Sequence, residues 1–131
     1  MEPRIVGAVL IEHNGKFLLG RRNKENYRDR WVIPGGGVKW GEETRYAALR
    51  ELKEETGIDA EIVRFIGFKE IINLPGNYHA VLFFFLGKAK HLEVKGGDDL
   101  SEARFFSCEE IKKLKVAESV EWVLREISVW N

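Results

Sequence analysis

The sequence predicts an α+β domain in which strands dominate, one helix lies near the centre and further helices close the chain. Three observations support this fold class. Short apolar runs alternate with turn residues, a central amphipathic segment ends at a glycine, and two amphipathic segments lie near the carboxyl terminus. The length of 131 residues suits one hydrophobic core, so we expect a single domain over residues 1–131.

The first predicted elements are two strands joined by a tight turn, over about residues 4–21. Two apolar runs flank Asn14-Gly15, a dipeptide that favours the positive φ angles of a two-residue hairpin turn. Residues 31–33 predict a further short strand. We expect Pro34 and the three glycines that follow it to end this strand, because proline cannot donate a ladder hydrogen bond.

The central helix is predicted from residue 42 or 43 to residue 56, because Gly57 supplies a C-terminal stop. Residues 58–72 are rich in Ile, Val and Phe around Gly67, and they predict either one strand or a bent pair of strands. The continuous apolar run within residues 78–90 predicts a central strand that is covered on both faces.

The last predicted elements are a short strand and two helices. The strand covers residues 103–106, and Ser107 with Glu110 forms the Ser-x-x-Glu pattern of a capping box. This cap predicts a helix over residues 108–115, and a final amphipathic helix is expected over about residues 117–129.

Charge and cysteine content argue against several classes of protein. The chain has 21 Lys and Arg against 21 Asp and Glu, so a general attraction to nucleic acid or to an anionic membrane is not expected. The single cysteine, Cys108, cannot form an internal disulfide, which fits a reducing compartment. The amino terminus lacks a secretion-signal pattern, and the longest apolar stretch, residues 80–86, is too short to cross a bilayer. We therefore expect a cytoplasmic protein.

Three glutamates share one face of the predicted central helix. At about 100° per residue, Glu54 lies about 60° to one side of Glu51 and Glu55 about 40° to the other. A solvated helix surface is the simpler interpretation of such a stripe. The glycine-rich segment beside it and the small side chain of Ala47 within it favour instead a site where carboxylate oxygens bind a hard cation such as Mg²⁺ or Mn²⁺.

The segment from residue 36 to residue 58 resembles the signature of the Nudix hydrolases, the MutT-like proteins. All nine fixed positions of that signature are present at the required spacing: Gly36, Glu42, Arg50, Glu51, Leu52, Glu54, Glu55, Gly57 and Ile58. The resemblance implies a Nudix fold, an α/β/α sandwich with a central mixed β-sheet, in which the signature forms a loop, a helix and a second loop.

The resemblance also implies roles for individual residues. The expected ligands of Mg²⁺, with Mn²⁺ as the alternative, are the backbone carbonyl of Gly35 and the side chains of Glu51, Glu54 and Glu55. Glu51 is also a candidate for the base that activates water, and Arg50 for the residue that orients a glutamate. Glu42 either supports the metal ligands or favours the amino end of the helix. We place Arg50, Glu51 and Glu54 among the catalytic residues.

An acidic stretch near the end of the chain offers one more metal ligand or base. Glu102, just before the last predicted strand, is preferred over Asp98 and Asp99 for this catalytic role. The alternative is a solvated loop whose charges protect a sheet edge.

Four residues outside the signature are candidates for substrate contacts: Arg21, Arg22, Trp31 and Tyr78. The two arginines end the second predicted strand, where they either contact phosphate or serve as edge-strand charges. Trp31, like Tyr27, could stack on a base, although its apolar neighbours favour a place in the core. Tyr78 lies in a segment that resembles family members acting on nucleoside triphosphates or nucleotide sugars.

The predicted reaction is hydrolysis of a nucleoside diphosphate linked to another group, by attack of water on phosphorus. ADP-ribose, another nucleotide sugar and a nucleoside triphosphate all remain open as the substrate. The alternatives are a domain that binds a nucleotide without cleaving it and a purely structural acidic helix.

The expected partner is a small nucleotide rather than nucleic acid or a membrane. The resemblance also favours a homodimer, with Trp40, Trp130 or the sheet edges as contacts.

Overall fold

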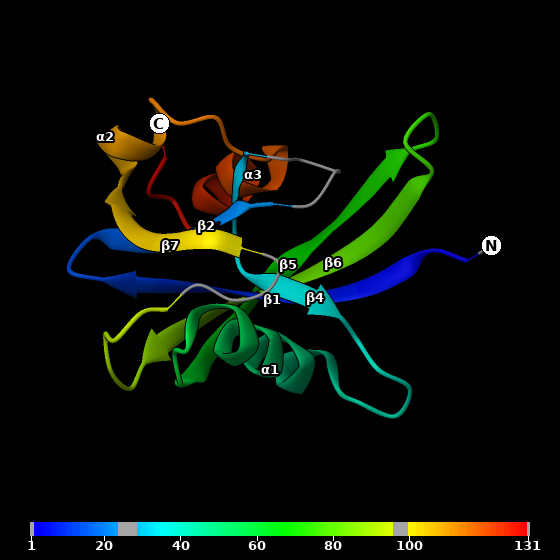
Figure 1. The fold of residues 1–131 in the computed structure, drawn as a ribbon, viewed down its shortest axis with the longest axis horizontal. Helices are drawn as coiled ribbons and strands as arrows, with labels where there is room; N and C mark the ends of the chain where they lie inside the picture. Colours follow the sequence, from blue (N-terminus) through cyan, green and yellow to red (C-terminus); the bar gives the residue numbers. More distant parts are fainter. Residues whose placement is uncertain (1, 24–28, 96–99, 131) are drawn as a thin grey trace.

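The computed structural model describes residues 2–23, 29–95 and 100–130, which form one mixed β-sheet flanked by helices (Figure 1). The elements are β1 (Arg4–His13), β2 (Lys16–Arg22), β3 (Trp31–Val32), β4 (Gly35–Gly37), α1 (Thr44–Thr56), β5 (Ala60–Asn73), β6 (Tyr78–Ala89), β7 (Leu100–Ser107), α2 (Cys108–Ile111) and α3 (Glu118–Glu126). The predicted hairpin is confirmed, because β1 and β2 pair antiparallel across Asn14 and Gly15, whose φ angles are 51° and 77°.

Strand β1 organises the sheet. The strand order is β3-β2-β1-β6-β5, with β4 also paired to β1 and β7 paired to β2. One edge of β1 runs parallel to β6 over residues 4–11. The other edge is divided, because residues 6–8 pair with β4 whereas residues 12–13 pair with β2. The sheet is therefore mixed, as expected.

β3 ends at Val32, so the prediction that this strand stops before the glycines is confirmed, but the three glycines form a further strand that was not predicted. Gly35–Gly37 is β4, which pairs antiparallel with β1. A Cβ atom on Gly35 would lie 2.6 Å from the Cβ of Ala8, so this close pairing requires a residue without a side chain. A run of glycines carries no apolar alternation, and the sequence therefore gave no strand signal here.

Helix α1 covers one face of the sheet and α3 covers the other (Figure 1). The core on the α1 face consists of Val9, Ile11, Leu18, Ala48, Leu52, Ile58 and Phe85. The core on the α3 face includes Ala8, Leu10, Phe84, Val120, Val123 and Leu124. Successive residues of β1 thus enter opposite cores, which explains its continuous apolar run and confirms the sandwich.

Helix α1 packs closely against β1 because Gly7 lies at the crossing point. A Cβ atom on Gly7 would lie 2.5 Å from the carbonyl oxygen of Thr44 and 3.0 Å from the backbone nitrogen of Ala48. The helix begins at Thr44, slightly later than predicted, and it ends as predicted at Gly57, whose φ angle is 77°. The first turn of α1 therefore packs against β1, the strand that also pairs with β4.

The two long strands of the second half were both predicted. β5 is one strand, the first of the two alternatives offered by the sequence, and it has two register shifts, one of them at Phe65/Gly67. β6 is only partly covered on both faces, since Phe84 and Phe85 are buried whereas Phe83 is half-buried.

The helices after β7 are shorter than predicted, although their start is confirmed. Ser107 accepts a hydrogen bond from the backbone N–H of Glu110, and the Glu110 carboxylate accepts one from the N–H of Ser107, which completes the capping box. α2 ends at Ile111 and α3 at Glu126, before the predicted ends at residues 115 and 129. Among the described residues, every helix is too short or too polar to cross a bilayer.

Candidate active site

The carboxylate of Glu51 lies directly against β4. A Cβ atom on Gly36 would overlap the Glu51 carboxyl group. Strand β1 holds both partners in place, because Gly7 contacts α1 and residues 6–8 pair with β4. A side chain at position 36 would therefore require the Glu51 carboxyl group to move from its place against this strand.

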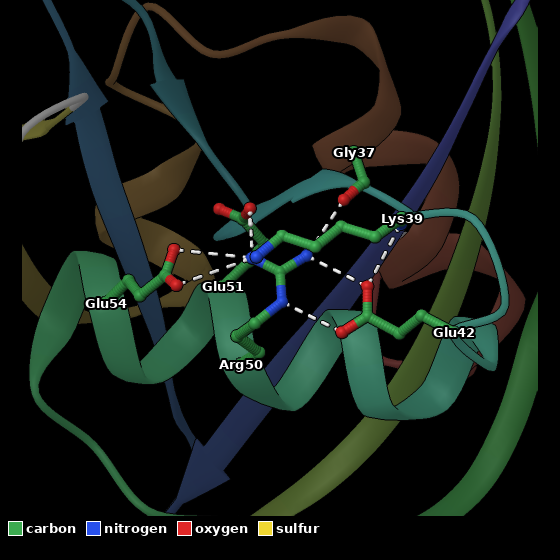
Figure 2. Close-up of polar contacts among 6 residues, drawn as sticks. All are labelled: Gly37, Lys39, Glu42, Arg50, Glu51 and Glu54. Carbon is green, nitrogen blue, oxygen red and sulfur yellow. Dashed lines mark hydrogen bonds and ion pairs between the residues drawn. The ribbon is translucent and has the colours of Figure 1, made fainter.

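Arg50 lies at the centre of a network of carboxylates (Figure 2). Its Nε donates to Glu42 Oε2 at 2.8 Å, and its Nη2 donates to Glu42 Oε1 at 3.0 Å. Nη2 also donates to the carbonyl oxygen of Gly37 at 2.9 Å, and Nη1 donates to Glu51 Oε1 at 2.8 Å. The forked contact with Glu42 and the contact with β4 fix the guanidinium plane, so that Nη1 faces Glu51.

The contact with Arg50 also keeps Glu42 ionised well into the acid range. Hydrogen bonds from Arg50 and from the backbone N–H of Lys39 lower the pKa of Glu42 to about 2. The same pairing raises the pKa of Arg50. Both carboxylate oxygens of Glu42 are engaged in these bonds, so it holds the arginine in position. Of the two roles predicted for Glu42, the contacts favour support of the site.

Two carboxylates converge on one nitrogen of the arginine. Arg50 Nη1 lies 2.8 Å from Glu51 Oε1 and 3.4 Å from each carboxylate oxygen of Glu54. The Glu51 side chain is 15% exposed and that of Glu54 is 55% exposed. The pair therefore extends from the surface of β4 towards solvent, and the guanidinium offsets the repulsion between the two negative charges.

The donor chemistry of this site fits a hard divalent cation. Carboxylate and carbonyl oxygens are the ligands that Mg²⁺ and Mn²⁺ prefer. In the part of the chain that the structure describes, no three Asp, Glu, His or Cys side chains are gathered into a metal-binding group. Glu51 and Glu54 meet at Arg50, whereas Glu55 is 6% exposed and lines a cleft beside them. Two of the three predicted carboxylate ligands are thus brought together here, and the third lies at the adjoining cleft.

The cleft beside Glu55 has a volume of about 100 Å³. It lies between β4, the end of β5, the first half of β6 and the start of α3. Its lining includes Gly35 and Gly36, the polar residues Arg4, Arg22, Tyr78, Glu118 and Ser119, and apolar residues such as Ile71 and Phe84. Ligand pockets usually measure about 300–1,000 Å³. The enclosed space is therefore smaller than a usual ligand pocket.

The structure brings two of the predicted substrate residues to this cleft and adds others. Arg22 and Tyr78 line it, as do Arg4, Glu118 and Ser119, which were not predicted. Arg4 comes close to Tyr78 because β1 is parallel to β6. No local pattern in the sequence marks Arg4 or the start of α3 as functional, since their proximity depends on how distant segments pair.

Arg21 and Glu102 lie together on neighbouring strands, outside the set of residues that lines the cleft. Arg21 and Glu102 are opposite each other in the β2–β7 register and form an ion pair at 3.1 Å. Glu102 also pairs with Arg104 at 3.2 Å. The predicted catalytic role of Glu102 therefore receives no support from its position, and it stays a prediction. Asp98 and Asp99, the alternatives to Glu102, lie outside the described residues.

Trp31 belongs to the core, so base stacking by its ring is not supported. The residue is 6% exposed, and its ring packs edge-on against Phe106 with the centroids 4.8 Å apart. The guanidinium groups of Arg21 and Arg104 lie 5.9 and 5.6 Å from its centroid. Tyr27, the other stacking candidate, falls outside the described part of the chain.

Comparison with known proteins places this geometry in a family. The model of the family described as NUDIX domain matches residues 1–126. An ADP-ribose pyrophosphatase of Methanocaldococcus jannaschii is 29% identical over 131 residues, which cover 100% of this chain and 76% of that protein. An RNA pyrophosphohydrolase of Novosphingobium aromaticivorans is 46% identical over 61 residues, 47% of this chain and 38% of that protein, so the chain matches less than half of it.

The fold comparison agrees with the sequence comparison. The crystal structure of a MutT NUDIX hydrolase from Burkholderia pseudomallei superposes with a TM-score of 0.90 at 23% identity, covering 98% of this chain and 100% of that one. The likeness at this identity concerns the fold. The α+β sandwich predicted from the sequence is confirmed by it.

Proposed function

The chain belongs to the Nudix family, and on this basis we propose that it is a metal-dependent hydrolase of a nucleoside diphosphate linked to another group. In the proposed reaction water attacks phosphorus and the phosphorus–oxygen bond of the diphosphate linkage breaks. The observation that supports this most is the convergence of Glu51 and Glu54 on Arg50 beside the glycine strand β4. A solvated acidic stripe would need neither the forked arginine nor the missing side chain at Gly36.

Glu51, Glu54, Glu55 and the backbone carbonyl of Gly35 are the groups that we propose as ligands of Mg²⁺, with Mn²⁺ as the alternative. When bound, the cation would neutralise phosphate oxygens and lower the pKa of water. Glu51 is our candidate for the base, because Gly36 and Arg50 fix its carboxylate in one orientation. Glu42 acts through Arg50 and is a positioning residue.

We propose that the cleft next to Glu55 receives the nucleoside or the sugar end of the substrate. Tyr78 offers a ring for stacking, and Arg4 and Arg22 offer positive charge to the phosphates. The carboxylate of Glu118 and the hydroxyl of Ser119 offer hydrogen-bonding groups at the other wall. In this proposal the diphosphate lies between these groups and the glutamates of α1.

ADP-ribose is the first substrate to test. The match to the relative named ADP-ribose pyrophosphatase covers 100% of this chain, whereas the match to the RNA pyrophosphohydrolase covers 47% of this chain. Cleavage of ADP-ribose would release AMP and ribose 5-phosphate. Cleavage of a nucleoside triphosphate would instead release a monophosphate and pyrophosphate, so the products distinguish the two substrate classes.

The decisive experiment is a nucleotide panel incubated with Mg²⁺, with the products identified by ³¹P NMR. The wild type and two variants would be compared: Glu54→Gln, which alters the convergent pair, and Glu43→Gln as a matched control. Glu43 is exposed and pairs with Arg45, away from Arg50. We expect Glu54→Gln to lower kcat/KM by at least about 100-fold, as is usual for a lost transition-state contact, and Glu43→Gln to retain activity.

The same panel tests the alternative of a domain that only binds nucleotides. If the wild type cleaves no member while one member raises the melting temperature, the hydrolase proposal is wrong. If Glu54→Gln retains full activity, the assignment of the site is wrong even though the protein is an enzyme.

We further propose that the protein is a cytoplasmic homodimer that pairs through β5. β5 is the last strand in the sheet order, so its outer edge offers backbone groups that a second copy could pair in the same way. Phe65, Phe68 and Ile72 on this strand are 48%, 61% and 55% exposed. Sedimentation equilibrium of the wild type and of Phe68→Asp tests this, since a monomeric wild type would contradict it.

A further inference from the structure

A second and larger cavity lies at the other end of the strands. It has a volume of about 870 Å³ and is lined by the β1–β2 turn, the ends of β5 and β6 and the chain around α2 and after α3. Among the described residues, its lining shares no member with the cleft beside Glu55. Its volume lies within the range of about 300–1,000 Å³ that is usual for small-molecule sites.

Apolar side chains form much of the wall of this cavity. Val63, Leu92 and Val129 line it, and these residues are 58%, 49% and 42% exposed. Phe17 and Leu86 also line the cavity. Phe17 belongs to the core on the α3 face, and Leu86 packs against that core. Large apolar groups gathered around one hollow usually mark a surface that a ligand or partner covers.

The lining of this cavity also carries a net positive charge. Arg64, Lys88 and Lys90 line the cavity together with one carboxylate, that of Glu12. With the histidines neutral, three positive charges and one negative charge give the lining a formal charge of +2, although the whole chain has a net charge of zero. The Glu12 carboxylate already accepts a hydrogen bond from the backbone N–H of Gly15 at 3.3 Å.

We propose that this cavity binds a small amphipathic anion, a molecule with an apolar chain and one carboxylate head group. The apolar wall accounts for the chain, and the lysines at the end of β6 account for the head group. A purely polar anion would leave Val63 and Leu92 uncovered, and a neutral apolar molecule would gain nothing from the positive charge of the lining. The proposal is independent of the hydrolase site, since neither set of residues contributes to the other.

The test is a ¹⁵N–¹H NMR titration with decanoate, with decanol as the neutral molecule of equal chain length. We expect saturable decanoate binding that shifts the amide signals of residues 87–92 and leaves those of residues 50–54 in place. The double variant Lys88→Ala/Lys90→Ala should weaken binding about five-fold, the effect of two exposed ion pairs. Lys113→Ala/Lys115→Ala is the matched control, because those exposed lysines lie outside the lining.

A further variant tests the apolar wall. Val63→Asp should abolish decanoate binding while the melting temperature stays close to that of the wild type, because the side chain is exposed. The proposal is overturned if decanoate does not bind saturably, if decanol binds as tightly, or if the affinity is the same in both lysine double variants. Binding that shifts only amides near Glu51 would also contradict it.

Discussion

Two clusters of arginine and glutamate occur in this molecule, and they differ in how firmly they are held. In the first, Arg50 is 21% exposed and contacts Glu42 and Glu51, which are 18% and 15% exposed. In the second, on β2 and β7, Glu102 is 33% exposed and its partners Arg21 and Arg104 are 42% and 62% exposed. The residue types are the same, but the first cluster is less exposed to water, and its arginine also donates to a backbone carbonyl, that of Gly37.

The difference shows what makes a charged cluster into a site. Solvent screening leaves an exposed ion pair worth little, and its side chains lose conformational entropy when they pair. In the Arg50 cluster a forked contact and a neighbouring strand have already fixed the guanidinium, so the orientation of Glu51 is set before a substrate arrives. The following predictions test this contrast, starting with the largest expected effect.

Replacing Arg50 with Lys should strongly reduce activity. A lysine cannot make the forked contact with Glu42 while also contacting Gly37 and Glu51. We expect kcat to fall about 10- to 100-fold, as when a group that orients a metal ligand is lost, with a smaller change in KM. Arg45→Lys on the exposed surface of α1 is the control. A rise in KM with kcat unchanged would instead assign Arg50 to substrate binding.

Replacing Gly36 with Ala should affect both stability and activity. The added methyl group would overlap the Glu51 carboxyl, so either the side chain or β4 must move. We expect reduced hydrolysis, because the flexible Glu51 carboxyl group must move, and a loss of up to about 1 kcal/mol in the free energy of unfolding, measured in urea. The control is Ala103→Gly, which changes a single methyl group on another strand, β7. Gly15→Ala is unsuitable as a control because Gly15 has a positive φ angle. Unchanged activity of Gly36→Ala would contradict the proposed steric role.

The Glu42–Arg50 pair should make stability depend on pH in the acid range. The folded pKa of Glu42 is about 2, below its ordinary value of 4.5, so the pair stabilises the fold fully above about pH 4.5 and loses this effect as the pH falls towards 2. Glu42→Gln should therefore be less stable than the wild type at pH 7. Urea unfolding at several pH values should show this difference shrinking between pH 4.5 and pH 2, and a constant difference would disagree with the pairing.

Replacing Glu102 with Gln should have the smallest effect. An exposed ion pair contributes up to about 1 kcal/mol, so the variant should remain close to the wild type in stability and in kcat. The catalytic role predicted from the sequence would instead require a fall in kcat of about 100-fold. Steady-state kinetics with the substrate found in the panel decides between the two outcomes.

Much of the fold could be predicted because its signals are local. Asn14-Gly15 marked the hairpin, Gly57 marked the end of α1, and Ser107 with Glu110 marked the start of α2. β4 could not be predicted, because its strand conformation depends on pairing with β1 rather than on its own residues. α2 was predicted too long, because after Ile111 the backbone continues in turns with hydrogen bonds between residues three apart, from Lys113 to Glu110 and from Leu114 to Ile111.

The sequence by itself determined the family and the acidic face of α1, because a helix repeats its geometry and places residues 51, 54 and 55 on one side whatever surrounds it. Only the tertiary structure decided which of these carboxylates meet. In the tertiary structure Glu51 and Glu54 contact Arg50, whereas Glu55 lines the cleft. Trp31 lies in the core, and Glu102 forms a separate ion pair with Arg21. The physical reason is that the contacts that set these positions join separate segments. Gly37 and Glu42 orient Arg50, and the pairing of β2 with β3 and β7 places Trp31 and Glu102.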